Sequence, residues 1–208
     1  MPEIYEPAED SYLLEKVLEN QIPNLIKKNP DLKFLEIGCG SGILLDSALN
    51  LGIKRKNILG ADINLDAVKH CKNMRFQAEA VKEIAQPQRE GRLSEGNRGC
   101  PRGFNCIKSD LFENIDGKFD IIVFNPPYLP EDKREDEDSK LATTGGKKGS
   151  EIINRFLKQA KTHLKKQGRI FLLASSLTKG INLKPYKKKL LRKKKIFFEE
   201  IYVWEISR

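Results

Sequence analysis

The chain contains few of the residues that most often carry metal or acid–base chemistry: its 208 residues include two histidines, four cysteines and two methionines. His70 and His163 stand in no motif, so we expect both on helix surfaces rather than in a catalytic site. Cys100 and Cys106, taken with His70 and Cys71, do not have the spacing of a structural zinc site. We therefore expect reduced thiols and no bound metal.

Long apolar runs are also absent. No stretch approaches the roughly 20 apolar residues of a membrane-spanning helix, and the start of the chain lacks the charged and then apolar segments of a secretory signal. These features predict a cytoplasmic protein with no membrane segment. A length of 208 residues suits one domain with a sizeable core, so we expect a single domain over residues 1–208.

Short apolar runs alternate with helical patterns, which is typical of an α/β protein with a doubly wound, mostly parallel sheet. An amphipathic helix is expected over residues 9–28, with Pro23 breaking or kinking it. Further helices are expected near 42–51, 65–84 and 150–166, the last followed by Gly168 as a C-terminal signal. Strands are expected near residues 33–37, 57–61, 104–108, 119–124 and 169–174.

The most informative motif is Asn-Pro-Pro-Tyr at residues 125–128, directly after a predicted strand. Parallel α/β sheets hold their ligands at the carboxyl ends of strands. The side-chain oxygen of Asn125 and the carbonyl of Pro126 match the two hydrogens of a planar NH2 group. Pro126 and Pro127 limit backbone motion, and Tyr128 offers a flat face for stacking. The motif predicts a clamp for an amide or an exocyclic amine, although a proline-rich turn that merely ends a strand has the same composition.

A second motif follows the first predicted strand. Glu36 is followed by Gly38, Gly40 and Gly42 at alternate positions, and a helical pattern begins at Ile43. A strand, a glycine-rich turn and a helix N-terminus bring backbone N–H groups close to a ligand. Ile43 stands where a dinucleotide fingerprint has its last glycine or alanine, which argues against NAD or FAD and for a smaller nucleoside ligand.

Acidic residues end the next two predicted strands. Asp62 follows the last glycine of the loop by twenty residues and is placed to accept hydrogen bonds from both ribose hydroxyls of a nucleoside. It is also suited to cap the following helix, as are Asn64 and Asp66, and the two roles are compatible. Asp110 is a candidate acceptor for an adenine amino group, or a plain loop aspartate.

Together these motifs resemble those of the class I S-adenosylmethionine-dependent methyltransferases, over most of the chain. The segment Tyr-Glu-Pro-Ala-Glu-Asp-Ser-Tyr at residues 5–12 resembles more specifically the HemK-type glutamine methyltransferases, in their eukaryotic and archaeal release-factor branch. Start signals of an ordinary helix explain residues 7–11 as well, and both explanations are compatible. The resemblance implies a Rossmann-like fold and a cofactor pocket formed by Tyr5, Pro7, Glu9, Asp10, Ser11, Glu36, Gly38, Gly40, Gly42, Asp62, Ile63, Asp110, Leu111 and Asn125.

The same resemblance implies that a methyl group passes from S-adenosylmethionine to the side-chain amide of a glutamine, in the Gly-Gly-Gln motif of class I release factors. Asn125, Pro126 and Tyr128 would be catalytic, and Pro127 would join them in binding the substrate. It also implies a small zinc-binding activator protein at the edge of the third strand. Three alternatives stay open: amino-group methylation of nucleic acid, methylation of a protein lysine, and a non-catalytic cofactor-binding subunit.

Two segments depart from the family pattern. Residues 85–104 form an insertion rich in glycine, proline and arginine, which we expect to be a mobile loop beside the third strand. Between residues 175 and 197 the chain is shorter than in relatives. We therefore expect the C-terminal antiparallel strands to be reduced or distorted, with closing strands near 196–198 and 201–206.

Charge is distributed unevenly. The net charge is +9, and residues 184–195 hold eight basic residues and no acid, so 9 − 8 leaves +1 elsewhere. This run is typical of a solvated helix face, although a surface for RNA, the ribosome or an acidic partner has the same composition. Acidic residues dominate positions 131–138, after the Asn-Pro-Pro-Tyr motif, and would favour a basic protein segment over a phosphate backbone.

Overall fold

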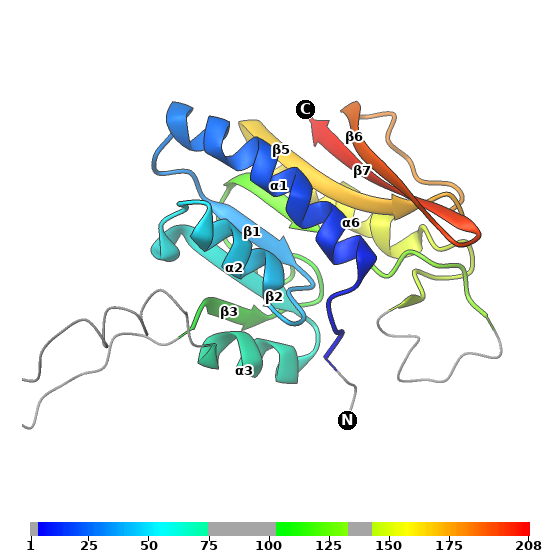
Figure 1. Ribbon diagram of the computed structural model, residues 1–208, viewed down its shortest axis with the longest axis horizontal. Helices are drawn as coiled ribbons and strands as arrows, with labels where there is room; N and C mark the ends of the chain where they lie inside the picture. Colours follow the sequence, from blue (N-terminus) through cyan, green and yellow to red (C-terminus); the bar gives the residue numbers. More distant parts are fainter. Residues whose placement is uncertain (1–3, 75–102, 133–142) are drawn as a thin grey trace, which may run out of the picture.

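The computed structural model describes residues 4–74, 103–132 and 143–208. Within them seven strands form one sheet in the order β3-β2-β1-β4-β5-β7-β6, and β7 runs antiparallel to both of its neighbours (Figure 1). This arrangement confirms the predicted doubly wound, mostly parallel sheet. The parallel strands are β1 (Phe34–Ile37), β2 (Ile58–Asp62), β3 (Asn105–Lys108), β4 (Phe119–Phe124) and β5 (Leu164–Ser175).

Helices cover both faces of this sheet (Figure 1). One face carries α1 (Glu9–Lys28), α2 (Ile43–Asn50) and α3 (Leu65–Asn73), and the other carries α6 (Glu151–His163). A short 3-10 helix (Arg55–Asn57) precedes β2. Successive residues of a strand point to opposite faces, so Phe34 packs with the first group of helices and Leu35 with α6. Because both faces are buried, the central strands are apolar along most of their length.

Helix α1 continues through Pro23, so of the two predicted outcomes the break was wrong, while the kink stays a prediction. A proline inside a helix costs about 3 kcal/mol because one backbone hydrogen bond is lost. Apolar packing on both sides outweighs this cost: Leu18 and Ile22 are fully buried before Pro23, and Leu25 and Ile26 pack against the same core after it.

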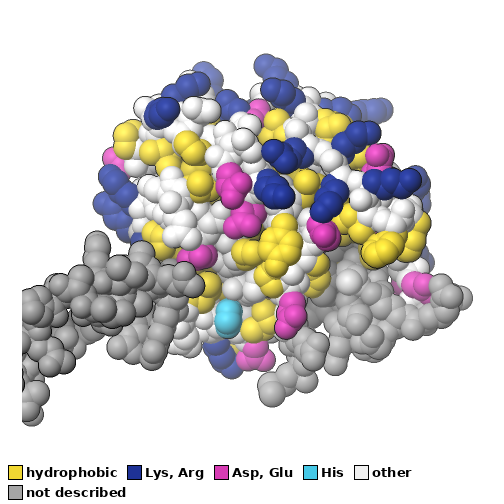
Figure 2. All heavy atoms as spheres, viewed as in Figure 1, with side chains coloured by type: hydrophobic (Ala, Val, Ile, Leu, Met, Phe, Trp, Pro, Cys, Tyr) yellow, Lys and Arg dark blue, Asp and Glu magenta, His cyan; other side chains and the backbone are white. Residues whose placement is uncertain are grey.

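The C-terminal edge of the sheet is longer than predicted. The basic run forms strand β6 (Lys187–Ile196), which pairs with β7 (Glu199–Ser207) across nearly its whole length, apart from a register shift between Leu190 and Arg192. Of the two outcomes predicted for these strands, the reduction was wrong, whereas the register shift is a local distortion. The prediction of a solvated helix face over the basic run was also wrong, because this run forms a strand. The segment that the sequence predicted to be shorter than in relatives is the connection between β5 and β6, and it contains no helix. Exposed lysines along an edge strand hinder pairing with another chain, and Figure 2 shows Lys and Arg side chains gathered over β6.

Other boundaries differ in smaller ways. Helix α6 ends at His163, and Gly168 lies inside β5 rather than at a helix end. A side chain at Gly168 would approach the Phe119 carbonyl oxygen to 2.9 Å, so this glycine permits close contact between β4 and β5. Most of the predicted insertion and the acidic positions from 133 onward lie outside the described residues. In the part of the chain that the structure describes, no helix is long and apolar enough to span a membrane.

Candidate active site

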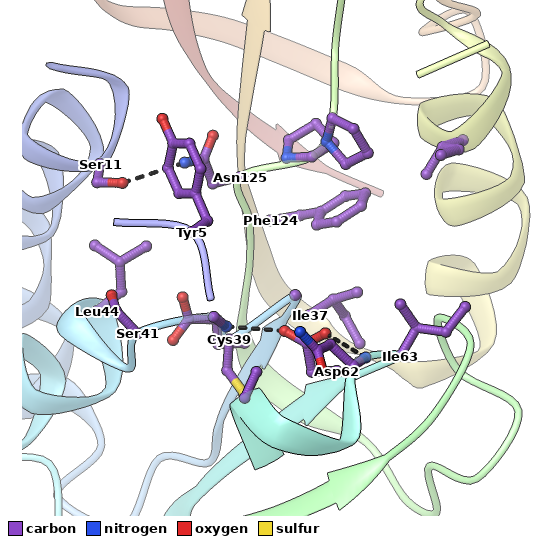
Figure 3. A pocket seen from close by; sticks show the side chains of 18 of the residues that line it. Tyr5, Ser11, Ile37, Cys39, Ser41, Leu44, Asp62, Ile63, Phe124 and Asn125 are labelled. Carbon is purple, nitrogen blue, oxygen red and sulfur yellow. Dashed lines mark hydrogen bonds between the residues drawn. The ribbon is translucent and has the colours of Figure 1, made fainter. Parts of the chain in front are cut away.

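A pocket of about 260 Å³ opens at the carboxyl ends of β1, β2 and β4 (Figure 3). The start of α1, the glycine-rich loop after β1 and the ends of β2 and β4 form its walls, so motifs distant in sequence meet in one place. Of the predicted site residues, those that line it are Tyr5, Asp10, Ser11, Glu36, Gly38, Gly40, Asp62, Ile63, Asp110, Leu111, Asn125, Pro126, Pro127 and Tyr128.

Three predicted site residues do not line the pocket. Gly42 is the N-cap of α2, with a positive φ of 80°, and a side chain there would come within 2.6 Å of the Met74 sulfur. Its role is close packing against α3. Glu9 is exposed and forms an ion pair with Lys194 of β6, and Pro7 precedes the first turn of α1 without lining the pocket.

The glycine-rich loop turns its backbone toward the pocket. The N–H of Gly38 donates to the Ala61 carbonyl over 2.7 Å, which anchors the loop to β2. Gly40 has a positive φ of 47°, and a side chain at this position would meet no atom within 4 Å. The space in front of Gly40 is therefore open to a ligand that approaches the backbone.

Asp62 connects the end of β2 with this loop (Figure 3). Its carboxylate accepts the N–H of Gly40 and the N–H of Asn64, each over 2.8 Å. Burial raises the pKa of Asp62, and these backbone N–H groups act in the opposite direction. The side chain of Asn64 accepts the N–H of Asp66, so Asn64 is the N-cap of α3. The carboxylate of Asp62 is therefore not needed as the cap and bonds to the glycine-rich loop instead.

The amide of Asn125 is held by the start of α1. Its Nδ2 donates to Oδ2 of Asp10 over 3.2 Å and lies 3.4 Å from the Ser11 hydroxyl (Figure 3). Its Oδ1 is buried and has no hydrogen-bond partner among the described residues. Buried polar atoms are rarely left unpaired, so this oxygen is available to a donor on a ligand.

Two tyrosines flank this amide. The hydroxyl of Tyr5 donates to both carboxylate oxygens of Asp10, each over 3.0 Å. Burial raises the pKa of Tyr5 and of Tyr128, and the nearby charge of Asp10 adds to both increases. The hydroxyl of Thr178 donates to the Tyr128 carbonyl over 2.7 Å, which fixes the backbone directly after the two prolines.

Glu36 is the buried acid at the end of β1. Its Oε2 has no hydrogen-bond partner in the described part of the chain. Burial raises the pKa of Glu36 well above its ordinary value, and negative charge at Cys106 and Asp62 contributes further.

The sequence did not indicate two further features of the pocket. Arg155 of α6 lines it and forms an ion pair with Asp110 over 2.8 Å. In the sequence, Arg155 looks like any charged residue on a helix surface. Leu111 is buried with a positive φ of 52°, and its carbonyl accepts the Ser109 hydroxyl over 2.9 Å. That bond supports a conformation that residues other than glycine rarely adopt.

Comparisons with known proteins agree with this geometry. The family model described as Eco57I restriction-modification methylase matches residues 56–202, which is more than half of the chain. A protein of Methanocaldococcus jannaschii named putative protein N5-glutamine methyltransferase is 41% identical over 97% of this chain and 90% of that protein. The eRF1 methyltransferase catalytic subunit mtq2 of Schizosaccharomyces pombe is 31% identical over 85% of this chain and 74% of the relative.

A solved structure has the same fold. The E. cuniculi Mtq2–Trm112 complex, described as responsible for methylation of the eRF1 translation termination factor, superposes with a TM-score of 0.64. The two sequences are 23% identical, with 100% of this chain and 99% of that chain covered, and this likeness concerns the fold. The chain belongs to the HemK-type family of protein glutamine methyltransferases, which have the class I methyltransferase fold.

Proposed function

We propose that this protein transfers a methyl group from S-adenosylmethionine to the side-chain amide nitrogen of a glutamine, in the Gly-Gly-Gln motif of a class I release factor. Support comes from the names of two relatives, one a putative protein N5-glutamine methyltransferase and the other the catalytic subunit of an eRF1 methyltransferase. The pocket supplies the physical argument.

The residues around the glycine-rich loop fit the cofactor. A carboxylate has about four acceptor positions. The two N–H groups bonded to Asp62 leave acceptor positions for the two ribose hydroxyls of a nucleoside. The open space at Gly40 admits a ligand against the backbone. When bound, S-adenosylmethionine supplies a methyl group that its positive sulfur already activates, so the protein chiefly has to position the reactants.

The unpartnered oxygen of Asn125 is the observation that carries the proposal. An amide nitrogen is a poor nucleophile because its lone pair is delocalised into the carbonyl. Asn125 Oδ1 and the Pro126 carbonyl would accept the two hydrogens of the substrate NH2 group. This orients the lone pair of the nitrogen toward the methyl group and stabilises positive charge as it grows there. Tyr128 would stack against the planar amide.

A partner subunit is the second part of the proposal. The described part of β3 forms one edge of the sheet, with four residues and partly exposed side chains. The E. cuniculi relative was solved as a complex with Trm112. We take the β3 edge as the docking site for the partner that the family resemblance implies, a small zinc-binding activator protein. We further propose that the insertion over residues 85–104, which directly precedes β3 in the sequence, modifies, blocks or replaces that contact.

Radiolabelled methyl transfer tests the function. The acceptors would be an archaeal-type release factor, its Gly-Gly-Gln→Gly-Gly-Ala variant, and duplex or single-stranded DNA, each with and without the activator. Label on the wild-type factor alone is the expected result. Equal label on the Gly-Gly-Ala variant would contradict glutamine as the acceptor.

One observation favours a second candidate function, amino-group methylation of nucleic acid. The matched family model is that of a restriction-modification methylase, and it includes the Asn-Pro-Pro-Tyr residues. An exocyclic amine presents the same planar pair of hydrogens as an amide, but the base must be unpaired or flipped to reach the pocket. Label on DNA, together with binding that weakens steeply as salt rises, would favour this candidate.

A further inference from the structure

Three cysteines that are far apart in the sequence meet beneath the glycine-rich loop. Cys39 lies in the loop, Cys71 in α3 and Cys106 in β3, and all three are buried free thiols. Their Sγ atoms lie within 4.8 Å of one another, and those of Cys39 and Cys71 are 3.8 Å apart. The fold thus assembles a set of sulfur atoms that the sequence spacing does not indicate.

The geometry points to a binding site for one thiophilic metal ion, Zn²⁺ or Cu⁺, held by the sulfurs of Cys39, Cys71 and Cys106. A Zn–S bond of about 2.3 Å places two sulfurs on a tetrahedral ion about 3.8 Å apart. The Cys39–Cys71 separation already has this value, so small side-chain movements would bring all three sulfurs to one ion. Thiolate ligands select Zn²⁺ and Cu⁺ over hard cations such as Mg²⁺.

A second observation concerns a buried carboxyl group on the strands beside this cluster. Glu36 of β1 pairs with Gly60 of β2, and Gly60 pairs with Cys106 of β3, so the three residues follow one another across adjacent strands on one face. Gly60 has no side chain, and one at that position would come within 2.8 Å of the Cys106 sulfur. The Oε2 of Glu36 is buried without a partner. The Glu36 oxygens do not belong to the group of ligand atoms that lie within 4.8 Å of one another, so this side chain would have to move to occupy the fourth position of Zn²⁺, whereas the three sulfurs alone suit Cu⁺.

Such an ion would fasten the cofactor loop to the rest of the sheet. Cys39 lies between Gly38 and Gly40, so a metal bond at its sulfur would limit movement of the backbone that faces the pocket. Cys39 also lines the pocket, so the proposed metal site lies directly beneath the proposed cofactor site. The inference does not depend on the methyl acceptor, because metal binding is measured without any substrate.

The test uses the full chain, reduced with a non-thiol reductant and freed of metal with a chelator. Zn²⁺, Cu⁺ and Cd²⁺, the last as a spectroscopic substitute for Zn²⁺, would be added in separate titrations. Native mass spectrometry is expected to show one ion per chain, and Cd²⁺ should produce the ultraviolet thiolate-to-metal absorption band. Because loss of a supporting residue around a metal already costs about 10–100-fold in affinity, each of Cys39→Ala, Cys71→Ala and Cys106→Ala should cost about 100-fold or more.

Cys100→Ala is the control, because it removes the remaining cysteine and should leave one ion bound per chain. Circular dichroism of each variant separates loss of ligand from loss of fold, and the wild-type titration stands even where a variant fails to fold. Three results would each overturn the inference. These are a reduced wild-type chain that takes up no ion, metal binding lost in the Cys100→Ala variant, and binding unchanged in all three cluster variants.

Discussion

Nδ2 of Asn125 donates to Oδ2 of Asp10 over 3.2 Å, although 115 positions separate the two residues in the chain. Asp10 is buried and also accepts the hydroxyl of Tyr5. An acceptor on the nitrogen side of the amide determines which way the amide faces, so Oδ1 of Asn125 points away from Asp10 and stays unpartnered. The N-terminal segment therefore acts on the Asn-Pro-Pro-Tyr motif as a positioning element.

Replacing Asn125 tests the proposed clamp directly. Asn125→Ala removes the unpartnered oxygen and leaves Asp62 and the glycine-rich loop in place. Loss of one preorganised hydrogen-bonding group at a reacting centre costs about 100–1,000-fold in rate, and we expect a loss of at least this size in methyl transfer. Calorimetry should show that S-adenosylmethionine still binds. Turnover near the wild-type rate would exclude the clamp.

Asp10→Asn tests the positioning role of Asp10. The new amide keeps the shape of the carboxyl group but can present hydrogens to Nδ2 of Asn125, so the Asn125 amide loses its preferred orientation. We expect kcat to fall while the affinity for the release factor changes little. Glu19→Gln, an exposed change on the same helix, is the matched control. A purely structural role for Asp10 would instead lower stability and leave kcat of the folded fraction unchanged.

The buried carboxyl of Asp62 predicts a pH dependence of cofactor binding. Burial raises its pKa above the ordinary value of 3.8. Because the pKa of Asp62 is higher in the folded than in the unfolded chain, protonation of this carboxyl stabilises the fold. This stabilisation is complete below pH 3.8 and is lost as the pH rises through the raised pKa. Cofactor affinity should instead decrease as the pH falls through the same pKa. The reason is that the ionised carboxylate is a stronger hydrogen-bond acceptor for the cofactor than the protonated carboxyl group.

Asp62→Asn should remove this pH dependence and weaken binding of S-adenosylmethionine near neutral pH. Hydrogen bonds to a charged group contribute about 1.5–3 kcal/mol, which corresponds to about 10–100-fold in affinity. Calorimetric titrations of both proteins at several pH values provide the measurement. A wild-type affinity that stays constant between neutral pH and the pKa of Asp62 would contradict a role for its charge.

The sequence alone predicted the parallel part of the sheet and half of the residues that line the pocket. Apolar runs and short motifs are local signals, and parallel topology brings the ends of β1, β2 and β4 to one edge. Strand β6 was not predicted because its seven basic side chains give no apolar alternation, and it exists through pairing with β7. The Arg155–Asp110 ion pair and the three-cysteine cluster were missed for a related reason, since both join elements with no fixed spacing in the sequence.

Two glycines of the same loop should respond differently to alanine. Gly42→Ala places a methyl group within 2.6 Å of the Met74 sulfur at a positive φ, so we expect a loss of stability of about 1–3 kcal/mol. Gly40→Ala meets no protein atom within 4 Å and projects into the space proposed for the cofactor. Its larger effect should therefore be on S-adenosylmethionine binding. Urea unfolding and calorimetry on both variants provide the comparison, and identical profiles would contradict the assignment of separate roles.

The turn between β6 and β7 predicts a gain in stability. Ile196 pairs with Glu199, so Phe197 and Phe198 form a two-residue turn, and their side chains are 90% and 86% exposed. Phe197 has a positive φ of 49°, a conformation that costs most residues about 1–2 kcal/mol and that asparagine tolerates. Phe197→Asn should therefore raise the free energy of unfolding by about 0.5–1 kcal/mol.

Phe198→Asn is the matched control for this turn. Its φ is not positive, so urea unfolding should show a change within about 0.5 kcal/mol. A loss of stability in Phe197→Asn would mean that the Phe197 side chain makes contacts that outweigh its backbone strain, against its 90% exposure. The expected gain would mean that the chain keeps a strained, exposed phenylalanine at this turn although folding does not require it. Its presence would then have to be explained by something other than the stability of the isolated chain.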